Sequence, residues 1–391
     1  MARIVLAKNQ DRRLRSGHLW VFSNEIESIE GSPEPGGEVV VEDSRGGTVG
    51  TGLYNPHSLI AVRLFARRAR AIDDALLRER LEQAKALRER ILPVESTYRL
   101  VYSEGDFIPG LIVDRYGDYL GVQSLTMGVE RRLDAILDLL MDVMKPAGIC
   151  CRRDAPARAL EGLPMLEPLE RGTVPYRIDA PYEGYVIEVD LRGGQKTGEF
   201  LDMRDNRKRV AQEARGRSVL DLYCYTGLFS LHCATAGAIE VTGVDRSGPA
   251  IERARRNLAR NAPGKSVSFV EEETESALTR FTGEGTRFDM IVLDPPSLVK
   301  SRKAFREGSA KYEKLNATAM RLLPPGGILA TASCSHHVDA PAFLDILRSA
   351  AKRAGAAFRV IDVRGQSRDH PELLAARETS YLTLALLERI H

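Results

Sequence analysis

Short apolar runs separated by Gly, Pro and Asn fill the first part of the chain. Residues 36–43, 47–54 and 59–65 each place several apolar residues between such turn-forming residues. Many short runs of this kind, broken at close intervals, are typical of a small β barrel or sandwich. We therefore predict a β domain over residues 1–68.

A helix and a mixed segment come next. Residues 71–91 set Leu and Ala at helical spacing among charged residues, without Gly or Pro, which predicts a helix. Residues 111–123 contain two apolar runs around a turn and predict a hairpin, and residues 133–144 predict an amphipathic helix. With a further strand at residues 185–190, the segment 69–192 is predicted to form a central α+β domain.

From about residue 193 the pattern changes to strands that alternate with helices. Apolar runs predict strands at residues 218–222, 239–245, 267–270, 288–293, 327–332, 358–363 and 381–386, with helices at 228–236 and 248–261. Strands that alternate with helices imply a parallel, doubly wound sheet, so the fold class is α/β over residues 193–391. The run at residues 381–386 is expected to close this sheet.

The composition is that of an ordinary globular protein. Of 391 residues, 43% are hydrophobic and 28% are charged, and a chain of this length usually divides into two or three domains. No apolar stretch approaches the length of a membrane span, and residues 1–8 are too short and too soon polar for a signal peptide. We therefore expect a cytoplasmic protein without a membrane partner.

The cysteines and histidines predict neither disulfides nor a metal site. The five cysteines are an odd number with no repeated metal-ligand spacing, so reduced thiols are expected. Cys150 and Cys151 are interpreted as buried apolar filler. His336 and His337 are adjacent, and on an extended segment their side chains point to opposite faces, which prevents both from binding one ion.

Positive charge is clustered although the net charge is only +2. Lys and Arg gather at residues 12–15, 204–209 and 300–306. Any one such cluster is usually a solvated surface, but three, one of them beside a candidate catalytic turn, suggest sequence-independent binding of nucleic-acid phosphates. Aromatic residues make up only 6% of the chain, which argues against a binding platform built from a row of aromatics.

Two acidic residues at strand ends suggest a cofactor site. Asp221 ends the first predicted strand of the sheet and Asp245 ends the second, 24 residues later, as expected of one βαβ step. Gly227 is the only glycine between Asp221 and Ala236, which makes a pyrophosphate a poor fit, whereas S-adenosylmethionine needs only a turn beside its amino acid and sulfonium. Asp245 would accept both ribose hydroxyls. Glu273 could reach the adenine edge, in competition with the glutamates at positions 271, 272 and 275.

Two further strand ends suggest methyl transfer to C5 of a pyrimidine. Cys334 lies among small residues after an apolar run, where its thiolate could add to C6 and make C5 nucleophilic. A free cysteine is more often a small buried hydrophobe, which is the competing interpretation. Asp294, followed by Pro295 and Pro296, would hold the base at its N3 and N4 edge. Glu378 is the candidate for removing the C5 proton, with Asp294 or a water molecule as competitors.

These motifs resemble a known family. Residues 293–296 (Leu-Asp-Pro-Pro) and 333–337 (Ser-Cys-Ser-His-His), preceded by residues 194–198 and 201–207, are similar to the bacterial 23S ribosomal RNA 5-methylcytosine methyltransferases of the ribosomal large subunit methyltransferase I type. The N-terminal segments Gly-His-Leu-Trp-Val-Phe and Gly-Leu-Tyr-Asn-Pro resemble the PUA domain of that family, an RNA-binding β barrel. The resemblance spans nearly the whole chain in the same domain order.

The resemblance implies an enzyme that uses S-adenosylmethionine to methylate C5 of a cytosine in 23S ribosomal RNA or a large-subunit precursor, often as a homodimer. It implies an N-terminal PUA barrel, a central α+β domain and a C-terminal Rossmann-like catalytic domain, with Cys334 as the nucleophile and Asp294 as the acid that holds the base. The predicted cofactor set is Lys196, Thr197, Arg204, Asp221, Tyr223, Gly227, Asp245, Glu273 and Asp294. Within it Arg204 is expected to pair with the methionine carboxylate, because a guanidinium fork suits that group.

The sequence departs from the family pattern in three places. Glu199 stands where an aromatic residue is usual, and Glu273 replaces the usual aspartate after the third strand. Both changes should alter details of the cofactor pocket rather than the reaction. The turn at Asp294 also lacks the cysteine that several other RNA 5-methylcytosine enzymes use for product release.

Three alternative functions stay open at this point. Methylation of a base nitrogen would use the same acid-Pro-Pro turn, but those enzymes usually place an aromatic after it, where this chain has Ser297. A 5-methyluridine enzyme would share the thiolate step and differ in how the pocket reads position 4 of the base. The third alternative is a non-catalytic RNA-binding assembly factor with a vestigial cofactor site.

Overall fold

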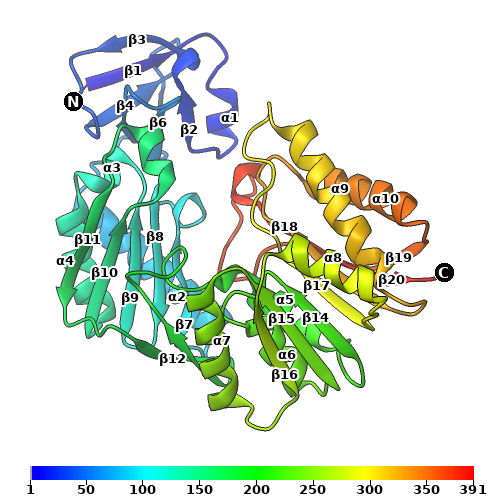
Figure 1. The fold of residues 1–391 in the computed structure, drawn as a ribbon. Helices are drawn as coiled ribbons and strands as arrows, with labels where there is room; N and C mark the ends of the chain where they lie inside the picture. Colours follow the sequence, from blue (N-terminus) through cyan, green and yellow to red (C-terminus); the bar gives the residue numbers. More distant parts are fainter. Residues whose placement is uncertain (1) are drawn as a thin grey trace. The chain divides into compact units, whose positions relative to one another are not determined.

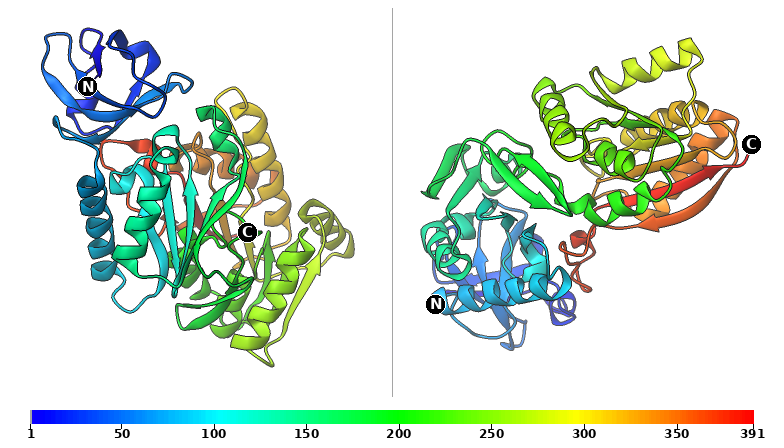
Figure 2. Two further views of the ribbon diagram at one scale, coloured as in Figure 1. Left: turned by 90° about the vertical axis from the view of Figure 1, so that its left-hand side faces the viewer. Right: turned by 90° about the horizontal axis from the view of Figure 1, so that it is seen from below.

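The computed structural model describes residues 2–391, which form two compact units (Figure 1). Unit 1 contains the residues up to 201 together with residues 368–379, and unit 2 contains residues 202–367 and 380–391. The chain therefore passes into unit 2, returns briefly to unit 1 and ends in unit 2 (Figure 2). The division at 1–68, 69–192 and 193–391 is finer than these two units and stays a prediction.

The first sheet of unit 1 is built from six strands in the order β2-β6-β5-β4-β1-β3. The elements are β1 (Ala2–Leu6), α1 (Arg12–Arg15), β2 (Trp20–Phe22), η1 (Ser23–Glu25), β3 (Ile26–Glu30), β4 (Glu38–Glu42), β5 (Thr48–Tyr54) and β6 (Ile60–Ala66). Burial alternates along β4, where Val39 and Val41 are buried and join Ile4 and Leu64 in one core. The predicted N-terminal β domain is confirmed.

A second sheet of unit 1 has five strands in the order β11-β10-β9-β8-β7 and is covered by helices. The elements are α2 (Asp74–Ile91), β7 (Thr97–Tyr102), η2 (Ser103–Asp106), β8 (Leu111–Tyr116), β9 (Tyr119–Ser124), α3 (Met127–Glu130), α4 (Leu133–Met144), β10 (Gly148–Arg153), η3 (Pro156–Glu161) and β11 (Leu166–Gly172), then the two-stranded pair β12 (Ile178–Tyr182) and β13 (Tyr185–Val189). α2 begins where the Asp73 side chain accepts a hydrogen bond from the Leu76 N–H. Leu76 of α2 and Leu137 of α4 belong to one core with alternate residues of the strands. No helix within residues 2–391 is long and apolar enough to cross a membrane.

Unit 2 is a seven-stranded sheet in the order β16-β15-β14-β17-β18-β20-β19. The elements are η4 (Leu201–Met203), α5 (Arg204–Ala211), β14 (Ser218–Leu222), α6 (Leu228–Thr235), β15 (Glu240–Asp245), α7 (Gly248–Asn261), β16 (Val267–Glu271), α8 (Thr274–Glu284), β17 (Met290–Leu293), α9 (Phe305–Arg321), β18 (Ile328–Ser333), α10 (Ala340–Ala354), β19 (Phe358–Arg364) and β20 (Thr383–Arg389), with η5 (Arg377–Thr379) in the segment that returns to unit 1. Ile291 and Leu293 of β17 pack in the core that contains α8, α9 and α10, whereas Met290 and Val292 pack in the core that contains α6. Successive residues of one strand thus face helices on opposite sides, as in a doubly wound sheet.

The order of the last two strands differs from the prediction. β20 does not close the sheet but lies between β18 and β19 and is antiparallel to both. Its residues Leu384 to Leu387 are all buried, as is typical of a strand covered on both faces. β19 takes the edge, where Val360 is 54% exposed among charged neighbours. The prediction assumed that the last strand in the chain is the last in the sheet. The more apolar strand, β20, instead takes the interior position, and the more polar β19 takes the edge.

Candidate active site

Four parallel strands of unit 2 lie side by side in the order β15, β14, β17 and β18 (Figure 1). Each carries a predicted site residue at or next to its carboxyl end: Asp245, Asp221, Asp294 and Cys334 respectively. Open α/β sheets bind their ligands at this edge. The sheet therefore brings these four residues to one edge, as the sequence predicts.

The Asp221 carboxyl group is buried beneath the turn that follows β14. Its Oδ2 accepts hydrogen bonds from the backbone N–H of Ser230 at 3.0 Å and from the Ser230 hydroxyl at 2.6 Å. Burial raises the pKa of Asp221 to about 7, although the Ser230 hydrogen bonds and the positive charge of Arg207 act in the opposite direction. Asp221 thus titrates near neutral pH and fixes the turn to the start of α6.

The turn itself has an unusual backbone. Tyr223 and Tyr225 have φ angles of 62° and 48°, in the left-handed region, which costs a non-glycine residue about 1–3 kcal/mol. Hydrogen bonds hold this conformation: the Cys224 N–H donates to the Val244 carbonyl at 3.0 Å, and the Tyr225 N–H donates to Asp245 Oδ2 at 3.0 Å. Strain of this kind clusters at ligand-binding sites because the surroundings must hold it in place.

Gly227 completes the turn for reasons of space. Its φ angle is 76°, and a Cβ atom there would lie 2.8 Å from Phe269 Cζ and 2.9 Å from Ala254 Cβ. No other residue type fits both the conformation and this close approach to α7 and β16. Gly227 therefore shapes the predicted cofactor turn by packing.

Asp245 presents a fixed carboxylate at the end of β15. Its Oδ1 accepts a hydrogen bond from the Ser247 N–H at 2.9 Å, and its Oδ2 accepts the one from Tyr225. The side chain remains only half-buried, and each oxygen keeps a second lone pair for a hydroxyl donor. This arrangement suits a ligand with two adjacent hydroxyls.

Two candidate acids, Glu272 and Glu273, follow β16, the strand next to β15. Glu273 precedes α8, is 58% exposed at its side chain and lies 3.8 Å from Arg246. Its competitor Glu272 is instead paired with Arg280 at 2.8 Å. Burial raises the pKa of Tyr223, whose hydroxyl hydrogen-bonds to Thr274 at the start of α8. Glu273 is thus more accessible to a ligand than Glu272.

The thiol of Cys334 lies next to the acidic proline turn. Its Sγ donates to the Pro295 carbonyl at 3.8 Å, and the Asp294 N–H donates to the Leu222 carbonyl of β14 at 3.4 Å. Cys334 is the partly exposed cysteine, and the other four are buried. Burial raises the pKa of all four other thiols, to about 11 for Cys150 and about 12 for Cys151. Only Cys334 combines access with a position at the candidate site.

A buried hydroxyl network, which was not predicted from the sequence, holds the residues on both sides of Cys334. The Tyr312 hydroxyl of α9 lies 3.0 Å from Ser335 Oγ and accepts from Ser333 Oγ at 3.2 Å. Ser335 Oγ also lies 2.9 Å from Ser297 Oγ and accepts from the Val299 N–H at 3.3 Å. The loops after β17 and β18 are thereby tied to α9. The only sequence signal was the pair of serines that flank the cysteine.

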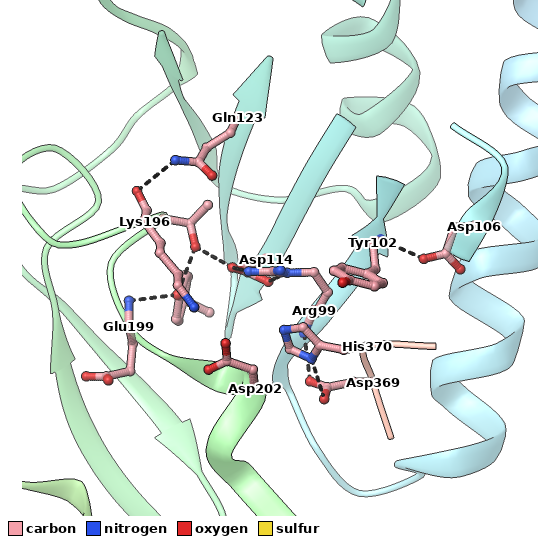
Figure 3. A network of polar contacts seen from close by, with 12 residues as sticks. Arg99, Tyr102, Asp106, Asp114, Gln123, Lys196, Glu199, Asp202, Asp369 and His370 are labelled. Atoms are coloured by element: carbon pink, nitrogen blue, oxygen red, sulfur yellow. Dashed lines mark hydrogen bonds and ion pairs between the residues drawn. The ribbon is translucent and has the colours of Figure 1, made fainter. Parts of the chain in front are cut away.

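The predicted cofactor segment at residues 194–198 belongs to unit 1, beside a polar network that includes Arg99 and Asp114 (Figure 3). The Thr197 hydroxyl donates to Asp114 and lies 3.3 Å from the Tyr116 hydroxyl. Asp114 also accepts two hydrogen bonds from Arg99, at 2.6 and 2.8 Å. All four side chains are buried, so Thr197 serves to fix the segment on β7 and β8.

Lys196 precedes Thr197 in the sequence, and a different contact holds its backbone. Its φ angle is 52°, and its carbonyl accepts from Gln123 Nε2 at 3.3 Å (Figure 3). Its ammonium group lies 4.4 Å from the centre of the Phe200 ring, within the range of a cation–π contact. Glu199, which departs from the family pattern, donates its N–H to the Tyr116 hydroxyl at 3.1 Å. The whole segment is thus held rigidly in unit 1.

Arg204 and Arg207 open α5 in unit 2 and are both buried. Burial lowers the pKa of His232 in α6 to about 3, and the charges of Arg207 and Arg204 add to this effect. The Arg207 guanidinium lies 5.6 Å from the centre of the Phe229 ring. These two arginines are therefore not part of a solvated basic surface, and the suggestion that their cluster binds RNA phosphates is wrong for them.

Glu378 lies in η5, on the segment that returns to unit 1. Its side chain is 45% exposed, and its Oε2 lies 3.2 Å from Nε2 of the buried His18. Burial and the positive charge of Arg13 lower the pKa of His18, which leaves its ring neutral near pH 7. No signal in the sequence pairs His18 with Glu378, and the role of Glu378 as a base stays a prediction.

Comparison with known proteins places this site in a family. Residues 4–67 match a PUA-like domain, and residues 152–379 match the S-adenosylmethionine-dependent methyltransferase family. Proteins named Ribosomal RNA large subunit methyltransferase I from Shewanella denitrificans and Alteromonas mediterranea are 36% and 33% identical to this chain, each covering 97% of both sequences. The chain belongs to the ribosomal RNA large subunit methyltransferase I family. The predicted family is confirmed.

Solved structures agree with the fold of this methyltransferase. A protein from Streptococcus mutans described as a SAM-dependent methyltransferase has a TM-score of 0.86 at 19% identity, covering 99% of this chain and 100% of the other. The structure of SMU.776 complexed with SAH has the same TM-score at 18% identity, with the same coverage. The predicted fold class, an α/β methyltransferase sheet with an N-terminal PUA-like domain, is confirmed.

S-adenosylmethionine is the cofactor of this methyltransferase, and the residues at the β14 and β15 ends fit it. The Asp245 carboxylate is oriented by two backbone N–H groups and still open to hydroxyl donors, which suits a ribose. The turn from Tyr223 to Gly227 has a fixed backbone but no glycine-rich loop for a pyrophosphate, which this cofactor does not contain. The predicted cofactor is confirmed.

Proposed function

We propose that this methyltransferase methylates C5 of a cytosine in 23S ribosomal RNA, alone or in a large-subunit precursor, through a covalent Cys334 adduct at C6. The observation that carries the proposal is the position of Cys334. It is a partly exposed thiol at the carboxyl edge of the sheet, hydrogen-bonded to the turn of Asp294, while the other four cysteines are buried. The relatives that cover 97% of the chain are named for ribosomal RNA of the large subunit, which supports this class of substrate.

The reaction assigns one task to each of three side chains. The Cys334 thiolate adds to C6, and the electron pair of the C5–C6 double bond makes C5 nucleophilic. S-adenosylmethionine supplies the methyl group that C5 takes up, and S-adenosylhomocysteine is released. Asp294 holds the N3 and N4 edge of the base. A base then removes the C5 proton, the C5–C6 double bond re-forms and the thiolate leaves.

We assign the C5 proton to Glu378, with Asp294 or a water molecule as the competing acceptors. The Glu378 side chain is 45% exposed and its Oε2 lies 3.2 Å from His18 Nε2, so the carboxylate is accessible and oriented by a buried partner. For the cofactor we propose contacts from Lys196, Thr197, Arg204, Asp221, Tyr223, Gly227, Asp245, Glu273 and Asp294. Among these, the half-buried Asp245 suits the ribose, and the buried Arg204 suits the methionine carboxylate.

The rival reactions differ in what they ask of Cys334. A base-nitrogen methyltransferase would leave this thiol without a task, and in this chain Ser297 after the proline pair joins the hydroxyl network. A 5-methyluridine enzyme would use the same thiol and differ only in the contacts at position 4 of the base. We infer that the enzyme acts in the cytoplasm. We also infer that it is a homodimer, and sedimentation of the purified protein would test this oligomeric state.

The deciding experiment is covalent trapping. We would incubate the enzyme with labelled S-adenosylmethionine and unmethylated 23S ribosomal RNA transcribed with 5-fluorocytosine, and a parallel transcript with 5-fluorouracil. Fluorine at C5 cannot leave as a proton, so an adduct that survives denaturation and maps to Cys334 is expected with the fluorocytosine transcript alone. Trapping by the fluorouracil transcript alone would establish the 5-methyluridine reaction. Methylation of unsubstituted RNA without any adduct would refute the covalent mechanism.

A further inference from the structure

An open cavity lies in unit 2 along the loop that begins at Cys334. Its volume is about 440 Å³, and it is lined by Arg302, Phe305, His336, His337 and Asp339. The lining comes from the loop after β17 with the first residue of α9, and from the loop after β18 that begins at Cys334. The volume falls within the range of small-ligand sites. We call it the Phe305 cavity.

Phe305 is the feature of this cavity that packing does not explain. It is 39% exposed, whereas the other phenylalanines within residues 2–391 are buried or half-buried. Its backbone is held at the start of α9, where its N–H donates to the Arg302 carbonyl at 3.3 Å. An aromatic ring left in water on a rigid helix end offers a flat surface for stacking.

The charges around Phe305 suit a phosphate. Arg302 lines the cavity, and Lys300, Lys303 and Arg306 lie beside it in sequence. All four side chains are exposed, and none makes an ion pair with a residue that the structure describes, in contrast to Arg280 and Arg353 of the same unit. Such unpaired cations bind phosphates at little desolvation cost.

The acidic and imidazole groups of the cavity are compatible with a bound phosphate. Asp339 is used as the N-cap of α10, where its Oδ1 accepts from the Ala342 N–H at 3.0 Å, so its charge is partly offset by the helix. The His336 ring lies 5.4 Å from the Tyr381 ring and is tilted by 34°. His337 is exposed and adds a hydrogen-bonding edge.

We propose that the Phe305 cavity binds the nucleotide next to the target base, with its base stacked on Phe305 and its phosphate on Arg302. A target base that is turned out of its stack also leaves its neighbour without a stacking partner. The Phe305 ring, which shares its cavity with residues of the loop after Cys334, replaces that partner and holds the strand while the target base is in the pocket. This inference rests on the proposed RNA methylation and adds a subsite for flanking RNA to it.

The test compares Phe305→Ala, Phe305→Leu and Phe305→Trp with the wild-type enzyme. Steady-state methylation of a 23S ribosomal RNA transcript is expected to show a KM raised about tenfold in Phe305→Ala and Phe305→Leu, with kcat within twofold. Phe305→Trp should restore the KM, because it keeps a stacking ring. Tyr176→Ala, which removes another exposed aromatic residue from unit 1, is the matched control and should behave as wild type.

A second readout does not depend on methylation. A short single-stranded RNA with a central cytosine and 2-aminopurine on either side of it reports stacking by loss of fluorescence. The wild type and Phe305→Trp should quench this signal, and Phe305→Ala should not; Arg302→Gln should lower the salt dependence of binding by about one phosphate contact. Equal quenching by the wild type and Phe305→Ala would overturn the subsite even if methylation proceeds. Loss of quenching in Phe305→Ala, with no RNA methylated by the wild type, would keep the subsite and refute the proposed function instead.

Discussion

The hydroxyl network behind Cys334 allows a quantitative prediction for Tyr312→Phe. The substitution keeps the ring, which is fully buried, and removes the contacts of its hydroxyl with Ser333, Ser335 and the Leu298 N–H. Each lost hydrogen bond is worth about 0.5–1.5 kcal/mol, and a buried hydroxyl left without a partner costs about 1–3 kcal/mol. Ser335 keeps Ser297 and the Val299 N–H, and Ser333 keeps the Ser335 N–H at 3.4 Å. The lost Leu298 contact is long, at 3.5 Å, so we expect a total loss of about 1–3 kcal/mol in the free energy of unfolding of unit 2.

Part of that loss should appear in catalysis, because the network fixes the two neighbours of Cys334. We expect kcat to fall roughly tenfold, equivalent to about 1.4 kcal/mol, while KM for RNA and the Kd for S-adenosylmethionine change less than twofold. The matched control is Thr331→Val. Thr331 lies on β18, as Ser333 does, and its hydroxyl makes a buried 2.7 Å hydrogen bond to Asn316 of α9 rather than to the residues around Cys334. Urea unfolding and steady-state kinetics measure both variants. Equal kcat losses in the two variants, or an unchanged kcat in Tyr312→Phe, would refute a positioning role.

Three further predictions use other parts of the site. Cys334→Ser should abolish turnover and keep the S-adenosylmethionine Kd, measured by calorimetry, within a few fold; full activity would exclude the covalent step. Replacing Lys300, Lys303 and Arg306 with Gln should lower the slope of log K against log salt for single-stranded RNA by about two, since each phosphate contact contributes about 0.7; an unchanged slope would mean that the cluster is only solvated. Because burial raises the pKa of Asp221 from 3.8 to about 7, the folded state binds the extra proton, so stability present at low pH is lost as the pH rises from about 4 through 7, by ~1 kcal/mol per pH unit. Thermal unfolding of Asp221→Asn should lack this decline, and parallel pH profiles of the two proteins would contradict the assignment.

Local sequence patterns predicted those elements whose boundaries depend on nearby residues. The helices at Leu133–Met144 and Gly248–Asn261 begin and end as predicted, because apolar spacing marks the first, and Ser247 caps the second by accepting from the Ala250 N–H. The order of β20 and β19 was missed, because strand order is decided by burial in the finished sheet. The return of residues 368–379 to unit 1 was also missed.

That returning segment shows why such features leave no local signal. Seven of its twelve residues are charged or polar, as is typical of an exposed loop, yet Asp369 and His370 are buried. The Asp369 carboxylate accepts from the Arg99 N–H at 2.9 Å, and its carbonyl accepts from Arg88 at 2.8 Å. The Tyr102 hydroxyl donates to the Thr379 carbonyl at 2.8 Å. These partners lie more than two hundred residues away in the sequence, beyond the reach of any periodicity.

The candidate site also contains residues that local sequence predicts and residues that it does not. The strand-end residues Asp221, Asp245, Asp294 and Cys334 could be predicted, because parallel strands bring their carboxyl ends to one edge whatever the packing behind them. The groups that hold the site in place could not, because they are buried hydroxyls and ion pairs. Cys334 is only partly buried against an apolar core of unit 2, so apolar packing alone does not fix its position. Buried polar groups can do so, since they fix geometry when all their hydrogen bonds are made.

In each unit, buried polar groups hold a segment that contains predicted site residues. In unit 2 the buried Tyr312 hydroxyl holds the serines around Cys334, and in unit 1 the buried pair of Asp114 and Arg99 holds Thr197 (Figure 3). A buried charge or hydroxyl destabilises the fold unless it is fully paired, so each network stabilises only one arrangement of its loop. The predicted cofactor segment and the loop of Cys334 are thereby held by buried side-chain contacts within each unit. Substitutions of the supporting residues Tyr312, Arg99 and Asp114 should therefore change catalysis, although none of the three is a proposed contact to S-adenosylmethionine or RNA.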